Sequence, residues 1–205
     1  AGNSTVAGAV GATKPTELAH VAGVNGKVVT YTSQLKTKEL KLDGGANVQL
    51  EEGAVIDVLT LGNANSQVKI KDTKVLEFTG KENVVLHLGQ GEVAFDGNDS
   101  TLKFNALGGD QRTVTIAGAH LNSGADGKGK IILRADGNNG GLAPVQSKLT
   151  VDDQKLGDAH TFKVIQVEGD GITEINVPIK TALLDIKDGA TLITTDASAS
   201  LATVT

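Results

Sequence analysis

The sequence predicts an all-β protein, and three observations favour a β-solenoid, that is, a chain of stacked coils. The first is a pattern of one apolar, one polar and one apolar residue that recurs along the chain. Side chains alternate between two faces of a strand, so each copy places two apolar groups on one face and a polar group on the other. The copies lie at residues 40–42, 48–50, 68–70, 86–88, 93–95, 102–104, 114–116 and 149–151, with Ala94 in place of the polar residue in 93–95.

The second observation is the punctuation between these strands, which is rich in Gly, Asn and Asp. Such residues suit repeated corners that need positive φ. The strands start roughly eight to twelve residues apart, so two of them make a coil of about 20 residues.

The third observation is a shortage of aromatic residues, with four Phe, one Tyr and no Trp. A compact sandwich usually relies on a buried aromatic anchor, whereas thin aliphatic layers do not.

Internal similarity supports the same prediction. Residues 50–56 and 186–192 share a pattern of an apolar residue, two charged residues, Gly, Ala, a variable residue and an apolar residue, and residues 116–121 carry a shorter version. Degenerate repeats of this type are typical of stacked coils. An antiparallel β-sandwich is the alternative, because short strands at this spacing suit both folds. The direction of neighbouring strands decides between them.

Residues 1–26 form a lead-in or cap that we expect to be weakly ordered, since residues 1–12 show no clear period. Within it, Pro15 and Gly23 frame one short helical turn. Residues 27–205 form a single β-solenoid domain. The Gly-rich segment at about 122–143, around a strand at residues 131–133, is predicted to be a loop excursion. Such a segment is either a carrier of binding contacts or a disordered tip. Strands return at residues 162–167, 172–177, 183–186 and 191–194.

Composition excludes several classes of protein. The net charge is −5 and the cations are dispersed, which argues against nucleic acid and anionic membranes as partners. No apolar stretch reaches the ~18 residues of a membrane helix, so we expect no membrane insertion. The absence of Cys excludes disulfides and Cys-ligated zinc, and it suits bacterial export through the periplasm. The absence of Met predicts an excised or processed segment.

The sequence predicts no catalytic, cofactor-binding or metal-binding residues. The four His residues are widely separated, so metal ligands do not converge. Glycosidase chemistry needs two carboxyl groups that face each other. The acidic pairs of this chain, Glu51 with Glu52 and Asp152 with Asp153, are adjacent in sequence. Adjacent residues of a strand point to opposite faces, so neither pair can act in this way. Gly/Asp runs do not recur in tandem, which disfavours calcium. We therefore expect no cofactor and no enzymatic activity.

One enzymatic alternative stays open, a polysaccharide-processing enzyme built on a β-helix. Such an enzyme needs a base beside a carboxylate-rich groove. Arg112 and Arg134 are the candidates by elimination, because they are the only arginines. The alternative requires one of them to gather at least two carboxylates around one substrate atom.

Residues 188–193 and 84–95 carry a resemblance that spans about residues 27–194. In them the chain resembles the passenger domain of a Gram-negative autotransporter, most closely the outer-membrane-protein-B-like surface-layer and adhesin family. The resemblance implies a right-handed parallel β-helix fragment on the bacterial cell surface, acting in adhesion to host cells, as a stalk or as a surface layer. Its partner would be a host-cell surface protein or glycan, or a second copy. The outward residues offered to that partner are Lys41, Gln49, Lys69, His87, Lys103 and Thr115.

Overall fold

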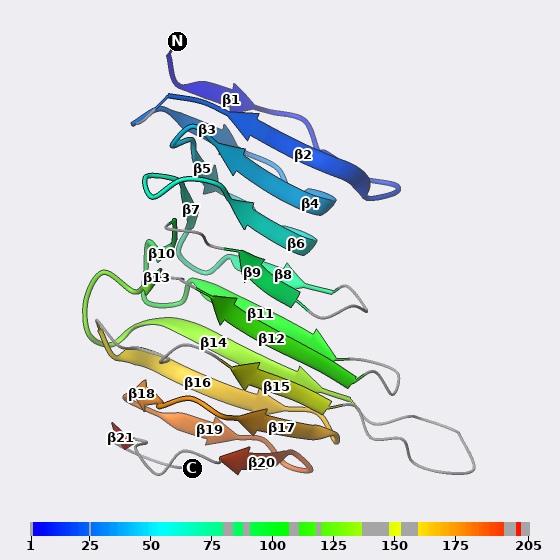
Figure 1. The fold of residues 1–205 in the computed structure, drawn as a ribbon, viewed down its shortest axis with the longest axis vertical. Helices are drawn as coiled ribbons and strands as arrows, with labels where there is room; N and C mark the ends of the chain where they lie inside the picture. The colour runs from blue at the N-terminus through cyan, green and yellow to red at the C-terminus, as the bar shows by residue number, and fades with distance from the viewer. Residues whose placement is uncertain are drawn as a thin grey trace.

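The computed structural model describes residues 2–24, 26–79, 84–87, 91–106, 111–117, 120–136, 148–152, 160–194 and 200–201. Every regular element in these ranges is a β-strand, and every strand pairing is parallel. The strands stack into a right-handed parallel β-helix of about 7 turns, with the two chain ends at opposite ends of the stack (Figure 1). The predicted solenoid is confirmed, and the antiparallel sandwich is wrong because no hairpin pairing joins neighbouring strands in the described ranges.

The strands are, in chain order, β1 (Ser4–Val6), β2 (Thr16–Ala22), β3 (Val28–Tyr31), β4 (Leu35–Asp43), β5 (Asn47–Leu50), β6 (Ala54–Leu61), β7 (Gln67–Ile70), β8 (Val75–Phe78), β9 (Val84–His87), β10 (Glu92–Phe95), β11 (Thr101–Ala106), β12 (Gln111–Ala117), β13 (His120–Asn122), β14 (Lys128–Ala135), β15 (Lys148–Asp152), β16 (Phe162–Glu168), β17 (Ile172–Ile175), β18 (Lys180–Thr181), β19 (Leu184–Ile186), β20 (Thr191–Thr194) and β21 (Ser200–Leu201).

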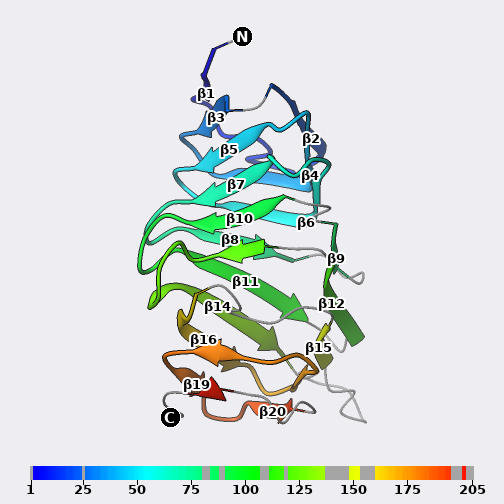
Figure 2. The ribbon, with the colours of Figure 1, turned by 60° about the vertical axis from the view of Figure 1, so that its left-hand side comes forward.

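The coils present three faces. Face 1 is a 6-stranded sheet in the order β1-β3-β5-β7-β10-β13, seen in Figure 2 as the stacked arrows from β1 to β10. The other strands form one 15-stranded sheet that divides at β6, which pairs with both β8 and β9. We call the branch through β8, β11, β14 and β16 face 2, and the branch through β9, β12, β15 and β17 face 3.

The bend between faces 2 and 3 is built into single long strands in the first coils. In β4, Lys38 and Glu39 are consecutive and neither is buried, although apolar residues alternate inward on both sides of them. In β6, Asp57 and Val58 repeat this arrangement. Two successive outward residues break the period of two, so the strand turns a corner and resumes its alternation on the next face. In the following coils separate strands occupy the two faces, β8 and β9 in one coil and β11 and β12 in the next.

Strand register sets the length of a coil. Val28 pairs with Asn47, Asn47 with Gln67, and Gln67 with Glu92, so successive coils advance by 19, 20 and 25 residues. Inward residues at equivalent positions therefore stack directly, and Ile56, Phe78 and Phe104 form one such column. All of them are buried.

All four Phe residues lie in this core. The ring of Phe78 stacks on that of Phe104, with centroids 5.1 Å apart and an interplanar angle of 22°. Phe95 meets Phe162 edge to face, with centroids 5.4 Å apart. The rest of the core is mainly Leu, Ile, Val and Ala from successive coils. The few aromatic residues thus join the central coils, and the aliphatic layers predicted from composition make up the remainder.

The structure corrects one local prediction. The helical turn predicted between Pro15 and Gly23 is wrong, because β2 occupies that segment and pairs in parallel with β4; tertiary pairing overrides a weak local signal here. Within residues 1–26, β1 and β2 form the first coil. Within the predicted excursion at about 122–143, β14 covers Lys128–Ala135, and residues 137–143 lie outside the described ranges.

Candidate interaction surface

The predicted outward residues lie on the outer faces wherever the structure describes their side chains. Lys41, Gln49, Lys69 and Lys103 are partly exposed, and the residues on either side of each are buried, as strand alternation requires. They are spread over all three faces and do not form one cluster. The side chains of His87 and Thr115 lie outside the described part of the chain.

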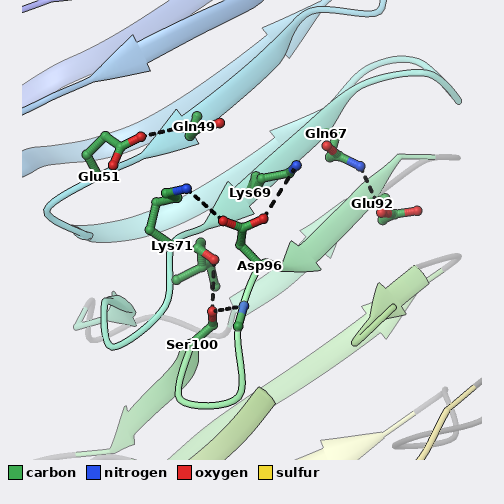
Figure 3. Close-up of polar contacts among 10 residues, drawn as sticks. Gln49, Glu51, Gln67, Lys69, Lys71, Glu92, Asp96 and Ser100 are labelled. Carbon is green, nitrogen blue, oxygen red and sulfur yellow. Dashed lines mark hydrogen bonds and ion pairs between the residues drawn. The ribbon is translucent and has the colours of Figure 1, made fainter. Parts of the chain in front are cut away.

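Face 1 carries a row of polar contacts between coils (Figure 3). Gln67 donates a hydrogen bond to Glu92 over 2.9 Å, from one strand to its neighbour in register. Asp96 lies between two ammonium groups, 2.8 Å from Lys71 Nζ and 3.7 Å from Lys69 Nζ. Lys71, followed by Lys69, holds the pKa of Asp96 below its usual value. The outer charges of this face are therefore paired across coils.

At the corner between faces 1 and 2, Asp99 connects successive coils. Its Oδ1 lies 2.8 Å from Lys130 Nζ and 2.8 Å from Lys163 Nζ, and these lysines belong to the next two coils. The backbone N–H of Asp99 donates to Asp72 Oδ1 of the preceding coil over 2.9 Å. The two ammonium groups lower the pKa of Asp99 to about 2, Lys130 having the larger effect. Asp99 thus links four successive coils, three of them through its carboxylate and the fourth through its backbone N–H.

Face 2 carries a group of charged and amide side chains, which we call the Arg134 cluster. It consists of Glu77, Lys103, Asn105, Arg134, Asp136, Gln166 and Glu168, drawn from four successive strands of this face and the residue that follows β14.

Within the Arg134 cluster each charge has a partner. The Arg134 guanidinium lies 2.8–3.0 Å from the carboxylate oxygens of Asp136, with both Nε and Nη2 in contact. Lys103 Nζ lies 3.1 Å from Glu168 Oε1. Asn105 donates to Glu77 over 2.7 Å. The contacts of Lys103 with Glu168 and of Asn105 with Glu77 join different coils, whereas Arg134 and Asp136 belong to the same coil.

This geometry bears on the enzymatic alternative. Arg134 does gather carboxylates, with Asp136 in direct contact and Glu168 and Glu77 close enough to act on its charge. However, the hydrogen bond to Asp136 raises the pKa of Arg134, so the guanidinium stays protonated and is unsuited to remove a proton from a sugar. The side chain of Arg112, the other candidate, lies outside the described part of the chain.

No group of three or more His, Cys, Asp or Glu residues that could hold a metal ion occurs among the described residues. The two His residues whose contacts are seen each face one carboxylate: His20 Nε2 lies 2.8 Å from Asp43 Oδ2, and His160 Nδ1 lies 3.9 Å from Asp126 Oδ1. None of the described residues belongs to a helix long and apolar enough to cross a membrane.

The pairing of polar side chains on the outer faces was not predicted from the sequence. A recognisable signal existed, because several partners are two residues apart and so share one face of a strand. Arg134 and Asp136 are such a pair, as are Lys41 and Asp43. The contacts across coils, such as Gln67 with Glu92, carry no local signal, since 25 residues separate the partners.

Comparison with protein families, curated proteins and solved structures finds no match for this chain. Function must therefore be inferred from the fold and its outer faces.

Proposed function

We propose that this chain is a non-catalytic module of a bacterial cell-surface protein, which binds host-cell surfaces through the outer face of its solenoid. The observation that carries the proposal is the pairing of outer charges across coils, with Asp99 joining the lysines of two other coils as the clearest case. Paired charges leave extended faces of mixed polarity. A face of this kind offers many weak polar contacts to a protein or glycan rather than one reactive centre.

Face 1 is the best candidate for the contact surface. Gln49 of β5 is in register with Lys69 of β7, and Gln67 lies two residues before Lys69 on the same face of β7. Amide and ammonium groups suit hydroxyl and carbonyl oxygens of a ligand. Stacked strands hold these groups in fixed positions, which lowers the entropic cost of binding. The cysteine-free composition is compatible with export and with a place on the cell surface.

Binding of the purified chain to cultured host cells tests this proposal. Replacing Gln49, Gln67 and Lys69 together with Ala should reduce cell binding while the β-rich circular dichroism spectrum is unchanged. A matched triple variant on other outer positions, Lys41→Ala, Thr60→Ala and Lys103→Ala, controls for a general loss of polar surface. Equal binding by both variants and the unmodified chain would contradict a role for face 1.

The predicted loop excursion can be tested in the same assay. Because β14 lies inside residues 122–143, deleting that whole segment would remove a structural strand. Deleting residues 137–143 alone is the sharper variant, and a loss of binding there would move the contact surface from face 1 to that segment.

The polysaccharide-processing alternative has one supporting observation, the gathering of Asp136, Glu168 and Glu77 around Arg134. It predicts release of reducing ends or unsaturated products from an acidic polysaccharide, and loss of that release in Arg134→Ala.

A surface-layer role predicts self-association instead, which light scattering over a range of concentrations measures.

A further inference from the structure

Asp–Gly dipeptides occur at residues 43–44, 96–97, 126–127, 136–137, 170–171 and 188–189, and all of these residues except 137 lie in the described ranges. In such a pair the Gly amide nitrogen can attack the Asp side-chain carboxyl carbon. A C–N bond forms, the carboxyl hydroxyl leaves as water, and a cyclic succinimide results. Hydrolysis of the succinimide gives either aspartate or isoaspartate, which carries an extra methylene in the backbone. The reaction needs no co-reactant besides water, and it requires a mobile carboxyl group and an amide nitrogen without a competing hydrogen bond.

The pair at Asp96 and Gly97 is protected at both groups. Lys71 and Lys69 hold the Asp96 carboxylate in ion pairs. The N–H of Gly97 donates to Ser100 Oγ over 3.0 Å, and that hydroxyl is buried. Attack by the Gly97 nitrogen would require both sets of contacts to break.

The pairs at residues 126–127 and 170–171 are also restrained. Asp126 Oδ1 accepts hydrogen bonds from the N–H and the hydroxyl of Thr161, each 2.7 Å long, and the N–H of the following Gly127 donates to the Thr161 carbonyl over 2.8 Å. The N–H of Gly171 donates to the Ala135 carbonyl over 2.6 Å.

At the pair of residues 43–44, the restraint acts on the acid. The Asp43 carboxylate lies 2.8 Å from His20 Nε2 and 3.3 Å from Lys41 Nζ. Gly44 packs so closely that a Cβ there would lie 2.3 Å from the Gly23 carbonyl oxygen. The turn therefore has little room to rearrange around a forming ring.

The last pair differs from these four. Asp188 and Gly189 are both exposed at the tip of the turn between β19 and β20. The turn is closed by the N–H of Ala190, which donates to the Lys187 carbonyl over 3.0 Å, and Gly189 has φ +82°. A Cβ on Gly189 would meet nothing within 4 Å. Among the described residues, no hydrogen bond or ion pair holds the Asp188 carboxylate or the Gly189 N–H.

We propose that the Asp188–Gly189 turn is the preferred site of spontaneous isoaspartate formation among the five described Asp–Gly pairs. The extra methylene would lengthen the turn before β20, which pairs with β17 from Thr191 to Thr194. Modification would then loosen the last coil first. The proposal is independent of what the outer faces bind.

Ageing the purified chain in warm, near-neutral buffer tests the proposal. Digestion with an aspartate-specific protease that does not cut before isoaspartate, followed by mass spectrometry, measures each site. We expect isoaspartate at residue 188 to accumulate roughly fivefold or more faster than at residues 43, 96, 126 or 170, since each of those sites must first lose at least one hydrogen bond or ion pair. In urea the five rates should converge, because the protection comes from the fold.

Two variants sharpen the test. Asp188→Glu keeps the charge but disfavours the five-membered ring, so it should abolish the product at this site. Ser100→Ala removes the acceptor of the Gly97 N–H and should raise the rate at residue 96. A native-state rate at residue 188 equal to, or below, that of any of the four restrained pairs would overturn the proposal.

Discussion

Lys103 Nζ lies 3.1 Å from Glu168 Oε1, although a whole coil separates their strands. Lys103 is in β11, which pairs with β14, and β14 in turn pairs with the β16 strand of Glu168. In register, Ile132 stands between Lys103 and Gln166, so the aliphatic stem of the lysine crosses the outer side of β14. This ion pair therefore connects three successive coils on the outer surface, whereas the backbone hydrogen bonds of the sheet connect only neighbouring coils.

Breaking the Lys103–Glu168 ion pair should lower the free energy of unfolding of the solenoid by a small, measurable amount. Both side chains are less than a quarter exposed, at 18% and 23%, so we expect a coupling of about 1 kcal/mol between Lys103→Ala and Glu168→Ala in a double-mutant cycle. Chemical denaturation measures it. The exposed pair of Lys38 and Glu17, at 56% and 79%, is the matched control and should show no measurable coupling. Equal coupling for the two pairs would show that burial does not strengthen the ion pair.

Truncating Phe104 should be among the most damaging single changes. The ring is buried and stacks on Phe78, so Phe104→Ala loses the buried apolar area and leaves a cavity that neighbouring coils cannot fill. We expect a loss of about 3–5 kcal/mol in the free energy of unfolding. Phe104→Leu keeps most of the volume and should cost clearly less. A small effect of the alanine variant would mean that the coils can collapse into the space.

Gly129 and Gly124 form a matched pair for separating steric conflict from backbone strain. Their φ angles are +70° and +72°. A Cβ at Gly129 would lie 2.7 Å from the buried Phe95 ring, whereas one at Gly124 would meet nothing within 4 Å. We expect Gly129→Ala to lower the free energy of unfolding by about 2–4 kcal/mol and Gly124→Ala by about 1 kcal/mol. Similar losses for both variants would assign the effect to φ alone.

The ion pairs of Asp99 should make the stability of the fold depend on pH in the acid range. Lys130 and Lys163 lower the pKa of Asp99 from 3.8 in a model peptide to about 2 in the folded chain. A depressed folded-state pKa stabilises the fold above pH 3.8, and this contribution is lost as the pH falls toward 2. Melting temperatures of the unmodified chain and of Asp99→Asn should therefore differ above about pH 4 and converge near pH 2. A difference that persists at pH 2 would show that the ion pairs are not its source.

Much of the fold follows from local sequence. The alternation in residues 48–50 and 68–70 predicted both strands and their inward faces, because the period of two is a property of the extended backbone itself. The shortage of aromatic residues favoured thin aliphatic layers. The predicted helical turn before Gly23 failed for the opposite reason. Nothing local in β2 shows that β4 lies beside it to complete a ladder.

The candidate surface was less predictable. Alternation placed Gln49 and Lys69 on the outside, as the structure confirms, but it could not show which charges meet. Asp99 and Lys163 are 64 residues apart, and their contact depends on the lengths of the two intervening coils.

Local sequence is enough to specify that this chain forms strands, which side chains each strand buries, and where glycine allows it to turn, because these depend on neighbouring residues and on backbone geometry. The parallel direction of the strands, the stacking of Phe78 on Phe104 and the contacts of Asp99 with other coils arise only in the folded stack. Those relationships depend on register between coils. Register is set by the sum of all turn lengths and by the packing of the whole stack, and no short segment contains that information.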